Sequence, residues 1–325
     1  MVGLRTAKSK SVSQQEMVHA KKNGMLAEIG RHKVLYLMIL PTIVYFLIFN
    51  YLPMAGVYLA FTDFNFKDGL LHSPFCGFDN FKTLFTSGVL TRLLRNTILY
   101  NLAFIVIGNI VEMLLAVVLS RFASQIFKKV VQTLSFMPYF VSYVIVASFS
   151  YILFNSRTGS FTLFVQSLGV KDFSTYGTPG IWPVIIVLVY LWKSVGYGMV
   201  VYLASVTSID ESLYEAAKID GATIHQQMKY ITIPMLVPTL ITLLLFALGS
   251  IARGQFELFY QLCGSQGQLY EITDIFDTYV FRMLQGTFDV GRGTAIGLFQ
   301  SLFGLVVVCV VNRLVNRYNS DYALF

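Results

Sequence analysis

Two long apolar runs with a polar island between them constrain the fold of this chain more than any other feature. The runs cover residues 182–206 and 233–249, and about 20 apolar residues are enough for a helix to cross the hydrocarbon core of a bilayer. The island, residues 210–234, reads DESLYEAAKIDGATIHQQMKYITIP, and its charged side chains cannot be buried in lipid. We therefore expect the island to lie at a membrane surface.

The composition of the whole chain is that of a membrane protein. Of its 325 residues, 55% are hydrophobic and 13% are charged, whereas about a quarter are charged in an average globular chain. The net charge of +7 does not indicate nucleic-acid binding, because basic residues crowd the segment before the first apolar run, as in a cytoplasmic flank. We expect residues 1–32 to form a basic, cytoplasmic and partly disordered tail without a cleavable signal peptide.

Six apolar stretches predict an all-α membrane protein with about six transmembrane helices in a single domain, residues 33–325. The predicted spans cover about residues 33–61, 93–119, 130–154, 182–206, 233–251 and 293–311. Basic residues gather in the tail, after the second span, in the island and at the C-terminus. The positive-inside rule then places both termini and the island in the cytoplasm.

The segment between the fifth and last spans, residues 252–292, is expected on the outer side. Apolar side chains recur at helical spacing from Ile272 to Met283, which predicts one amphipathic helix. Cys76 and Cys263 both fall in predicted outer loops, and the sequence leaves open whether they form a disulfide.

The chain carries no motif of a known catalytic or metal site. It lacks a phosphate-binding P-loop, an H-E-x-x-H zinc motif and a G-x-S-x-G nucleophile elbow. Its four histidines do not have the spacing of metal ligands. We therefore expect no catalytic residue, no metal and no nucleotide bound in the P-loop manner.

The island is expected to form two short helices joined by a turn. Asp210 can cap the first helix, and the small side chains of Ala216 and Ala217 would let another surface approach closely. Gly221 permits a sharp backbone turn, and Pro234 ends a second short helix before the fifth span. Spacing alone does not distinguish a docking element from a hairpin that merely joins two spans.

The island resembles the cytoplasmic coupling loop of ATP-binding-cassette (ABC) importer permeases of the carbohydrate-uptake, maltose-type family. The matching residues are Glu215, Ala216, Ala217, Asp220, Gly221, Ala222, Ile231, Ile233 and Pro234. Asp210 and Met228 depart from the pattern, since they stand where a proline and an aromatic residue are frequent. The likeness extends over nearly the whole chain beyond the tail, for example at Met137-Pro138-Tyr139, and it is nearest to the polysaccharide and complex-oligosaccharide subgroup.

The resemblance implies that residues 207–234 dock into a cleft on a separate ATPase. The residues that it assigns to this docking are Glu215, Ala216, Ala217, Asp220, Gly221 and Ala222. It further implies a homologous second permease, a dimer of ABC ATPase subunits that bind the ATP and magnesium, and an extracytoplasmic solute-binding protein. This chain would then be a multi-pass protein of the cytoplasmic membrane, without a cofactor of its own, that moves a carbohydrate by alternating access.

Polar and aromatic side chains within the spans are the candidates for the substrate path, because lipid does not tolerate unpaired polar groups. They are Asn109, Glu112, Tyr190, Trp192, Lys193, Tyr197, Phe246, Ser250, Arg253 and Gln300. The alternative for each is a structural pairing, a cation that reaches the interface or an interfacial aromatic belt. Lys193 and Arg253 would suit an acidic sugar such as a uronate oligomer, but two cations do not decide the substrate.

Three other functions remain open at this point. A self-sufficient secondary transporter or channel would work without an ATPase, and its island would have no special role. A permease for a solute other than a sugar would keep the coupling loop but line its path differently. A membrane scaffold that transports nothing would tolerate the loss of the polar residues in its spans.

Overall fold

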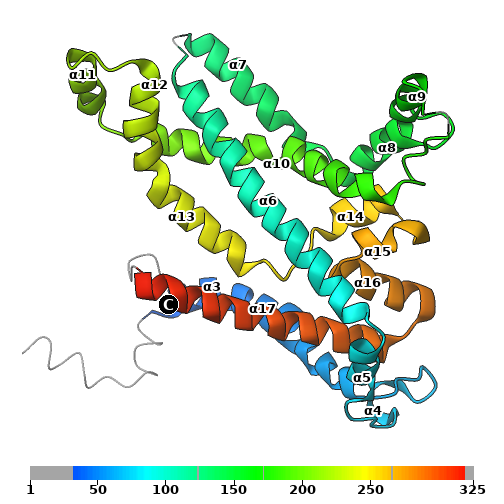
Figure 1. The fold of residues 1–325 in the computed structure, drawn as a ribbon. Coiled ribbons are helices and arrows are strands. Elements are labelled where there is room, and N and C mark those ends of the chain that lie inside the picture. Colours follow the sequence, from blue (N-terminus) through cyan, green and yellow to red (C-terminus); the bar gives the residue numbers. More distant parts are fainter. Residues whose placement is uncertain (1–31, 123, 171, 265, 319–325) are drawn as a thin grey trace, which may run out of the picture. The chain divides into compact units, whose positions relative to one another are not determined.

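All regular structure in the described part of the chain is helical (Figure 1). The computed structural model describes residues 32–318, apart from residues 123, 171 and 265. The predicted tail, residues 1–32, lies almost entirely outside the described residues. The chain divides into two compact units, Met1–Tyr58 and Leu59–Phe325, and the predicted domain boundary after residue 32 stays a prediction.

One continuous apolar helix makes up the described part of the first unit. It consists of α3 (Lys33–Phe46), the π-helical turn η1 (Leu47–Tyr51) and the 3-10 helix η2 (Leu52–Phe61), which runs on into the second unit. Pro53 has no N–H group to donate to the carbonyl four residues earlier, and the winding of the helix changes around it. The 29 residues are long and apolar enough to span a membrane, which confirms the first predicted span.

Four more long apolar helices lie in the second unit. They are α6 (Val89–Ser120), α10 (Trp182–Thr207) with its leading turn η4 (Pro179–Ile181), the run of α12 (Ile224–Gln227), η5 (Met228–Thr232) and α13 (Ile233–Gly249), and α17 (Val290–Tyr318). They confirm the second, fourth, fifth and last predicted spans. The connecting segments contain α4 (Gly69–His72), α5 (Asp79–Thr86) and α9 (Ser160–Ser167).

The third predicted span is not one straight helix. It consists of α7 (Gln125–Phe136), the 3-10 turn η3 (Met137–Phe140) and α8 (Tyr143–Phe154), and the two arms meet at 94°. Pro138 removes a helical donor, and Val141 and Ser142 between the arms are extended. The Ser142 hydroxyl then starts α8 by accepting a hydrogen bond from the Ile145 N–H at 3.4 Å. The sequence predicted the proline but not the right-angled bend.

The core of the second unit is built around the contact between α6 and α10, which cross in Figure 1. Trp182 and Tyr202, near opposite ends of α10, are fully buried in two separate apolar clusters. The Tyr202 hydroxyl donates to the Asn109 amide oxygen on α6 at 2.8 Å. Gly196 allows α10 to lie directly on α7, because a Cβ atom there would collide with the Ser135 carbonyl.

The segment before α17 folds into several short helices instead of one amphipathic helix. They are α14 (Phe256–Cys263), the turn η6 (Gly267–Leu269), α15 (Tyr270–Thr273), α16 (Phe276–Arg282) and the π-helical turn η7 (Met283–Thr287). The predicted helix over residues 272–283 is wrong because the backbone becomes extended at Asp274 and Ile275. Cys76 and Cys263 are free thiols, so the disulfide that the sequence left open is not formed.

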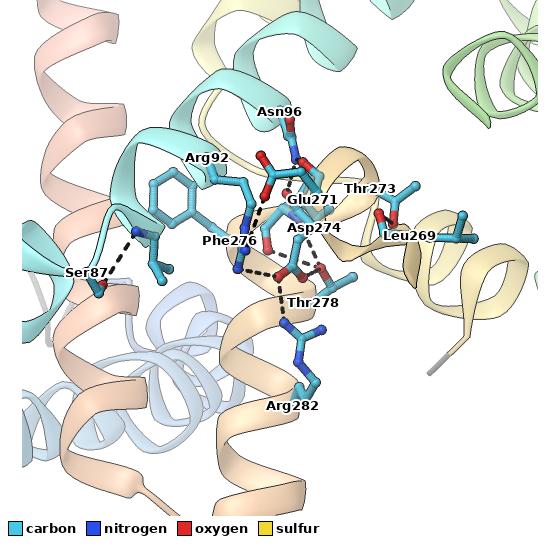
Figure 2. Close-up of polar contacts among 12 residues, drawn as sticks. Ser87, Arg92, Asn96, Leu269, Glu271, Thr273, Asp274, Phe276, Thr278 and Arg282 are labelled. Carbon is cyan, nitrogen blue, oxygen red and sulfur yellow. Dashed lines mark hydrogen bonds and ion pairs between the residues drawn. The ribbon is translucent and has the colours of Figure 1, made fainter. Parts of the chain in front are cut away.

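A buried carboxylate explains the break between α15 and α16. Asp274 is 1% exposed and accepts charged hydrogen bonds from Arg92 at 3.3 Å and from Arg282, while Thr278 donates to it at 3.1 Å (Figure 2). The Asn96 amide donates to the Asp274 carbonyl at 2.9 Å. Because Arg92 and Asn96 belong to α6, this Asp274 network ties the beginning of α6 to α15 and α16.

We predict that Asp274→Asn lowers the free energy of unfolding in detergent by about 3 kcal/mol, since it leaves the charges of two arginines without a buried partner. Glu271 is the matched control, because its carboxylate also pairs with Arg92 but is 67% exposed. Glu271→Gln is expected to change the same free energy by less than about 1 kcal/mol. Equal destabilisation by the two variants would contradict this assignment.

Candidate functional site

The polar island forms the two helices that its sequence predicts, but the second, α12, continues through η5 into α13, so the prediction that Pro234 ends it is wrong. Pro234 lies in the first turn of α13, a position that proline tolerates. The first, α11 (Glu211–Ile219), begins at Asp210, whose carboxylate accepts a hydrogen bond from the Ser212 N–H at 3.0 Å. Hydrogen bonds from Ser212 lower the pKa of Asp210 below its ordinary value, so Asp210 caps the helix as a carboxylate at neutral pH. The departure from proline at this position therefore leaves the helix start intact.

The turn between the two helices requires glycine for its backbone. Gly221 has a φ of +74°, and nothing lies within 4 Å of a Cβ atom placed there. The conformation, and not crowding within this chain, is therefore what disfavours other residues at this position. Thr223 and Gln226 then form a reciprocal capping box that begins α12.

The predicted docking residues lie together on the surface of this loop. Glu215, Ala216, Asp220 and Gly221 are exposed, whereas Ala217 and Ala222 are half-buried. The sequence analysis did not single out Ile219, which is 86% exposed. The sequence feature that could have identified Ile219 is its position between Lys218 and Asp220, because an apolar side chain there gains nothing from contact with water. Whether these residues touch an ATPase stays a prediction.

A three-residue contact, the Arg121 node, ties the loop to the span α6. Arg121 follows the last residue of α6, and its guanidinium lies 4.2 Å from the centre of the Tyr214 ring of α11. The same guanidinium donates to the Thr232 hydroxyl at 2.6 Å, and the Tyr214 hydroxyl lies 3.0 Å from that oxygen. Three separate elements, α6, α11 and η5, therefore meet at a buried threonine. The sequence assigned Arg121 only to a basic loop.

The second candidate feature is a cavity of about 940 Å³ between α6, α8, α10, α13 and α14. Its polar lining comes from three elements and the break before α8. Asn109 and Glu112 come from α6, and Ser142 lies at the break. Lys193 and Ser194 come from α10, and Gln255, Glu257 and Gln261 lie in or just before α14. The sequence did not predict the contribution of α14, because residues 252–292 are expected on the outer side. Only the tertiary fold brings α14 against the other helices that line the cavity.

The structure brings five of the ten predicted path residues to this cavity. They are Asn109, Glu112, Tyr190, Lys193 and Tyr197. The other five do not line it. Trp192 lines a separate recess beside α7, Phe246 and Arg253 are exposed, Ser250 donates to the Ala247 carbonyl, and Gln300 donates to Ala252 and Asp277. Contact of any of the ten residues with substrate stays a prediction.

Lys193 is held by the backbone of the broken third span. Its ammonium donates to the carbonyls of Tyr139 at 2.7 Å and Val141 at 2.6 Å, and more weakly to that of Pro138 at 3.4 Å. These carbonyls lie where the helix stops, and a lysine has three N–H donors. The cation therefore satisfies the acceptors that the break sets free. It also lies 4.9 Å from the centre of the Tyr143 ring.

Glu112, unlike Lys193, has no hydrogen-bond partner among the residues that the structure describes. Its carboxylate lies against Gly198 of α10, where any Cβ atom would overlap it. It forms no hydrogen bond or ion pair with the residues that the structure describes, and it belongs to the cavity wall. Gly198 is therefore needed for the space that the carboxylate occupies, and the acceptor oxygens remain available to a bound molecule.

Parallel aromatic rings complete the cavity wall. The Tyr139 and Tyr197 rings stack with centres 5.1 Å apart and planes 16° apart, and the Phe256 and Tyr260 rings stack at 5.2 Å and 15°. Carbohydrates are bound by such flat apolar surfaces together with hydrogen-bonding groups. The cavity can therefore hold a flexible polyhydroxylated molecule.

Comparison with known proteins gives a consistent set of relatives. The profile of the family described as "Binding-protein-dependent transport system inner membrane component" matches residues 105–320. Two proteins of Bacillus subtilis (strain 168) are each 34% identical to this chain. The match to Protein LplB covers 91% of this chain and 92% of LplB. The match to the polygalacturonan/rhamnogalacturonan transport system permease protein YteP covers 98% of this chain and 99% of YteP. A chain of a bacterial alginate ABC transporter, solved with an alginate pentasaccharide-bound periplasmic protein, superposes with a TM-score of 0.80 at 34% identity, covering 91% of this chain and 98% of its own.

We predict that Lys193→Met loosens the break in the third span, because it leaves the carbonyls of Tyr139 and Val141 without a donor. The expected loss in free energy of unfolding is about 1–3 kcal/mol. Hydrogen–deuterium exchange in detergent should rise over residues 137–146. Lys129→Met serves as the control, since Lys129 is an exposed lysine of α7; similar protection in the Lys193 and Lys129 variants would contradict the role of Lys193.

Proposed function

This chain belongs to the family of binding-protein-dependent transport system inner membrane components, and from that premise we propose that it couples ATP hydrolysis on partner subunits to carbohydrate uptake. It is a multi-pass membrane protein and a permease, not an enzyme. The partners that we propose are a second homologous permease, a dimer of ABC ATPase subunits that hold ATP and magnesium, and an extracytoplasmic solute-binding protein.

The observation that carries this proposal is the exposed loop formed by α11 and α12. Ala216, the glycine turn and the 86% exposed Ile219 form a surface that the described residues of the chain leave exposed. An exposed isoleucine offers apolar area that a docked partner would bury. We assign this surface to the ATPase, and we propose that the loop and both termini lie on the cytoplasmic side.

A carbohydrate is the solute that the site supports best. The cavity combines stacked aromatic rings with amide, hydroxyl and carboxylate groups, the combination that binds sugar rings and their hydroxyls. The transport systems named for polygalacturonan and for alginate, each 34% identical to this chain, support the same class. We therefore propose an oligo- or polysaccharide as the substrate.

The Arg121 node suggests how a movement of the loop reaches the cavity. When ATP binding closes the two ATPase subunits, α11 would move with them. Arg121 would pass that movement to α6, whose Asn109 and Glu112 form one wall of the cavity. ATP can shift the transporter between outward- and inward-facing states only as far as it binds the two states differently.

Gly221→Trp is expected to uncouple ATP hydrolysis from uptake, because it strains the turn and obstructs the docking face. Sugar uptake per ATP hydrolysed in proteoliposomes should fall by about 5- to 150-fold, the usual range of a coupling free energy. Gly169→Trp is the matched control: Gly169 also has a positive φ and open surroundings but lies in a different loop. Normal coupling in the Gly221 variant would contradict the docking assignment.

Thr232→Val tests the Arg121 node without changing side-chain volume. It removes the acceptor for Arg121 and the partner of Tyr214, so we expect the ATPase still to co-purify while uptake per ATP falls by about 2- to 30-fold. Thr242→Val, at an exposed position of α13, should leave that ratio unchanged. A parallel loss of ATPase binding and uptake would instead show that the node only supports folding.

A further inference from the structure

We infer that the cavity wall of this chain selects an uncharged oligosaccharide over one made of uronic acids. This inference rests on the proposed function and deepens it, because it names the charge class of the substrate. It follows from the three charged side chains that line the cavity in the described part of the chain: Glu112, Lys193 and Glu257.

The first step is that, among the residues that the structure describes, the cavity lining offers no free cation to a substrate carboxylate. Lys193 is the sole cation among the described lining residues, and its three donors point at the carbonyls of Pro138, Tyr139 and Val141. Turning the ammonium toward a uronate would take the donor away from the Tyr139 and Val141 carbonyls, whereas the Pro138 carbonyl would keep the Val141 N–H. Arg253, the other cation that the sequence suggested for an acidic sugar, does not line the cavity.

The second step is that two carboxylates face the same space. Glu112 enters from α6 and has no partner among the residues that the structure describes, and Glu257 enters from α14 and is exposed. An ionised carboxylate only accepts hydrogen bonds, so it suits the hydroxyl groups of a sugar, which donate. The exposed carboxylate of Glu257 would repel a uronate, the repulsion grows as the bound molecule displaces water, and neither acidic side chain offers a uronate a positive charge.

The third step is that the remaining lining is neutral and suited to sugar rings. The stacked pairs Tyr139–Tyr197 and Phe256–Tyr260 present flat apolar surfaces. Asn109, Gln255 and Gln261 supply amide groups that both donate and accept. The fold is shared with an importer of the acidic polysaccharide alginate, so charge selection is a property of the lining residues and not of the architecture.

The test uses the complete transporter, with its ATPase and binding protein, in proteoliposomes. The probes are short oligosaccharides in matched pairs that differ only at carbon 6: galactose against galacturonate, mannose against mannuronate and glucose against glucuronate. ATP-dependent uptake of the best pair should favour the neutral member by about tenfold or more, the ratio that corresponds to 1.4 kcal/mol. A uronate taken up at least as well as its neutral counterpart overturns the inference while leaving the proposed function intact.

Variants of the cavity then distinguish its contribution to substrate selection from the contribution of the binding protein. The double variant Glu112→Gln and Glu257→Gln should narrow the neutral-to-uronate uptake ratio by about tenfold, and Asp172→Asn should not, since Asp172 is an exposed carboxylate outside the cavity lining. An unchanged ratio in the double variant overturns the inference. If no probe is taken up although the ATPase is assembled, the proposed function fails and the inference fails with it.

Discussion

A helix that breaks inside an apolar bundle frees carbonyl groups that must find donors, and the cavity of this protein depends on how that requirement is met. The arms α7 and α8 meet at 94°, and the Lys193 ammonium donates to the carbonyls at the bend. Non-helical backbone at membrane depth is tolerated where it is buried in protein or lines a wet cavity. The bend and the cavity are therefore one feature, since residues 139–144 form part of the wall.

The long helix α6 connects the places where polar side chains are used. Its 32 residues extend over about 48 Å. Near its beginning Arg92 and Asn96 join the Asp274 network, in its middle Asn109 and Glu112 face the cavity, and directly after its end Arg121 contacts the loop. A long helix held at both ends by charged or aromatic contacts suits the coupling that we propose between the loop and the cavity.

For two basic residues, Lys193 and Arg121, the structure shows partners that the sequence did not predict. Lys193 was a candidate for an acidic sugar because a cation in an apolar run calls for a partner. The partner turned out to be the backbone of another span, which no sequence pattern announces. Arg121 was counted only as a basic loop residue, although it contacts Tyr214 and Thr232, which lie 93 and 111 positions later. The apolar spacing from Ile272 to Met283 predicted one helix, but the buried charge of Asp274 interrupts it.

By itself the sequence determined the local features: the apolar runs, the helix start at Asp210, the turn at Gly221 and the family resemblance of the loop. These depend on neighbouring residues and on the length of chain that lipid demands, so they can be derived from a linear string. Only the tertiary structure decided which polar side chains face one another. The partners of Lys193 and Asp274 are set by helices that come together across long stretches of chain, and so is the lack of a partner for Glu112 among the described residues. The free energy of a buried charge depends on such partners. The charge of the cavity therefore follows from packing and not from composition.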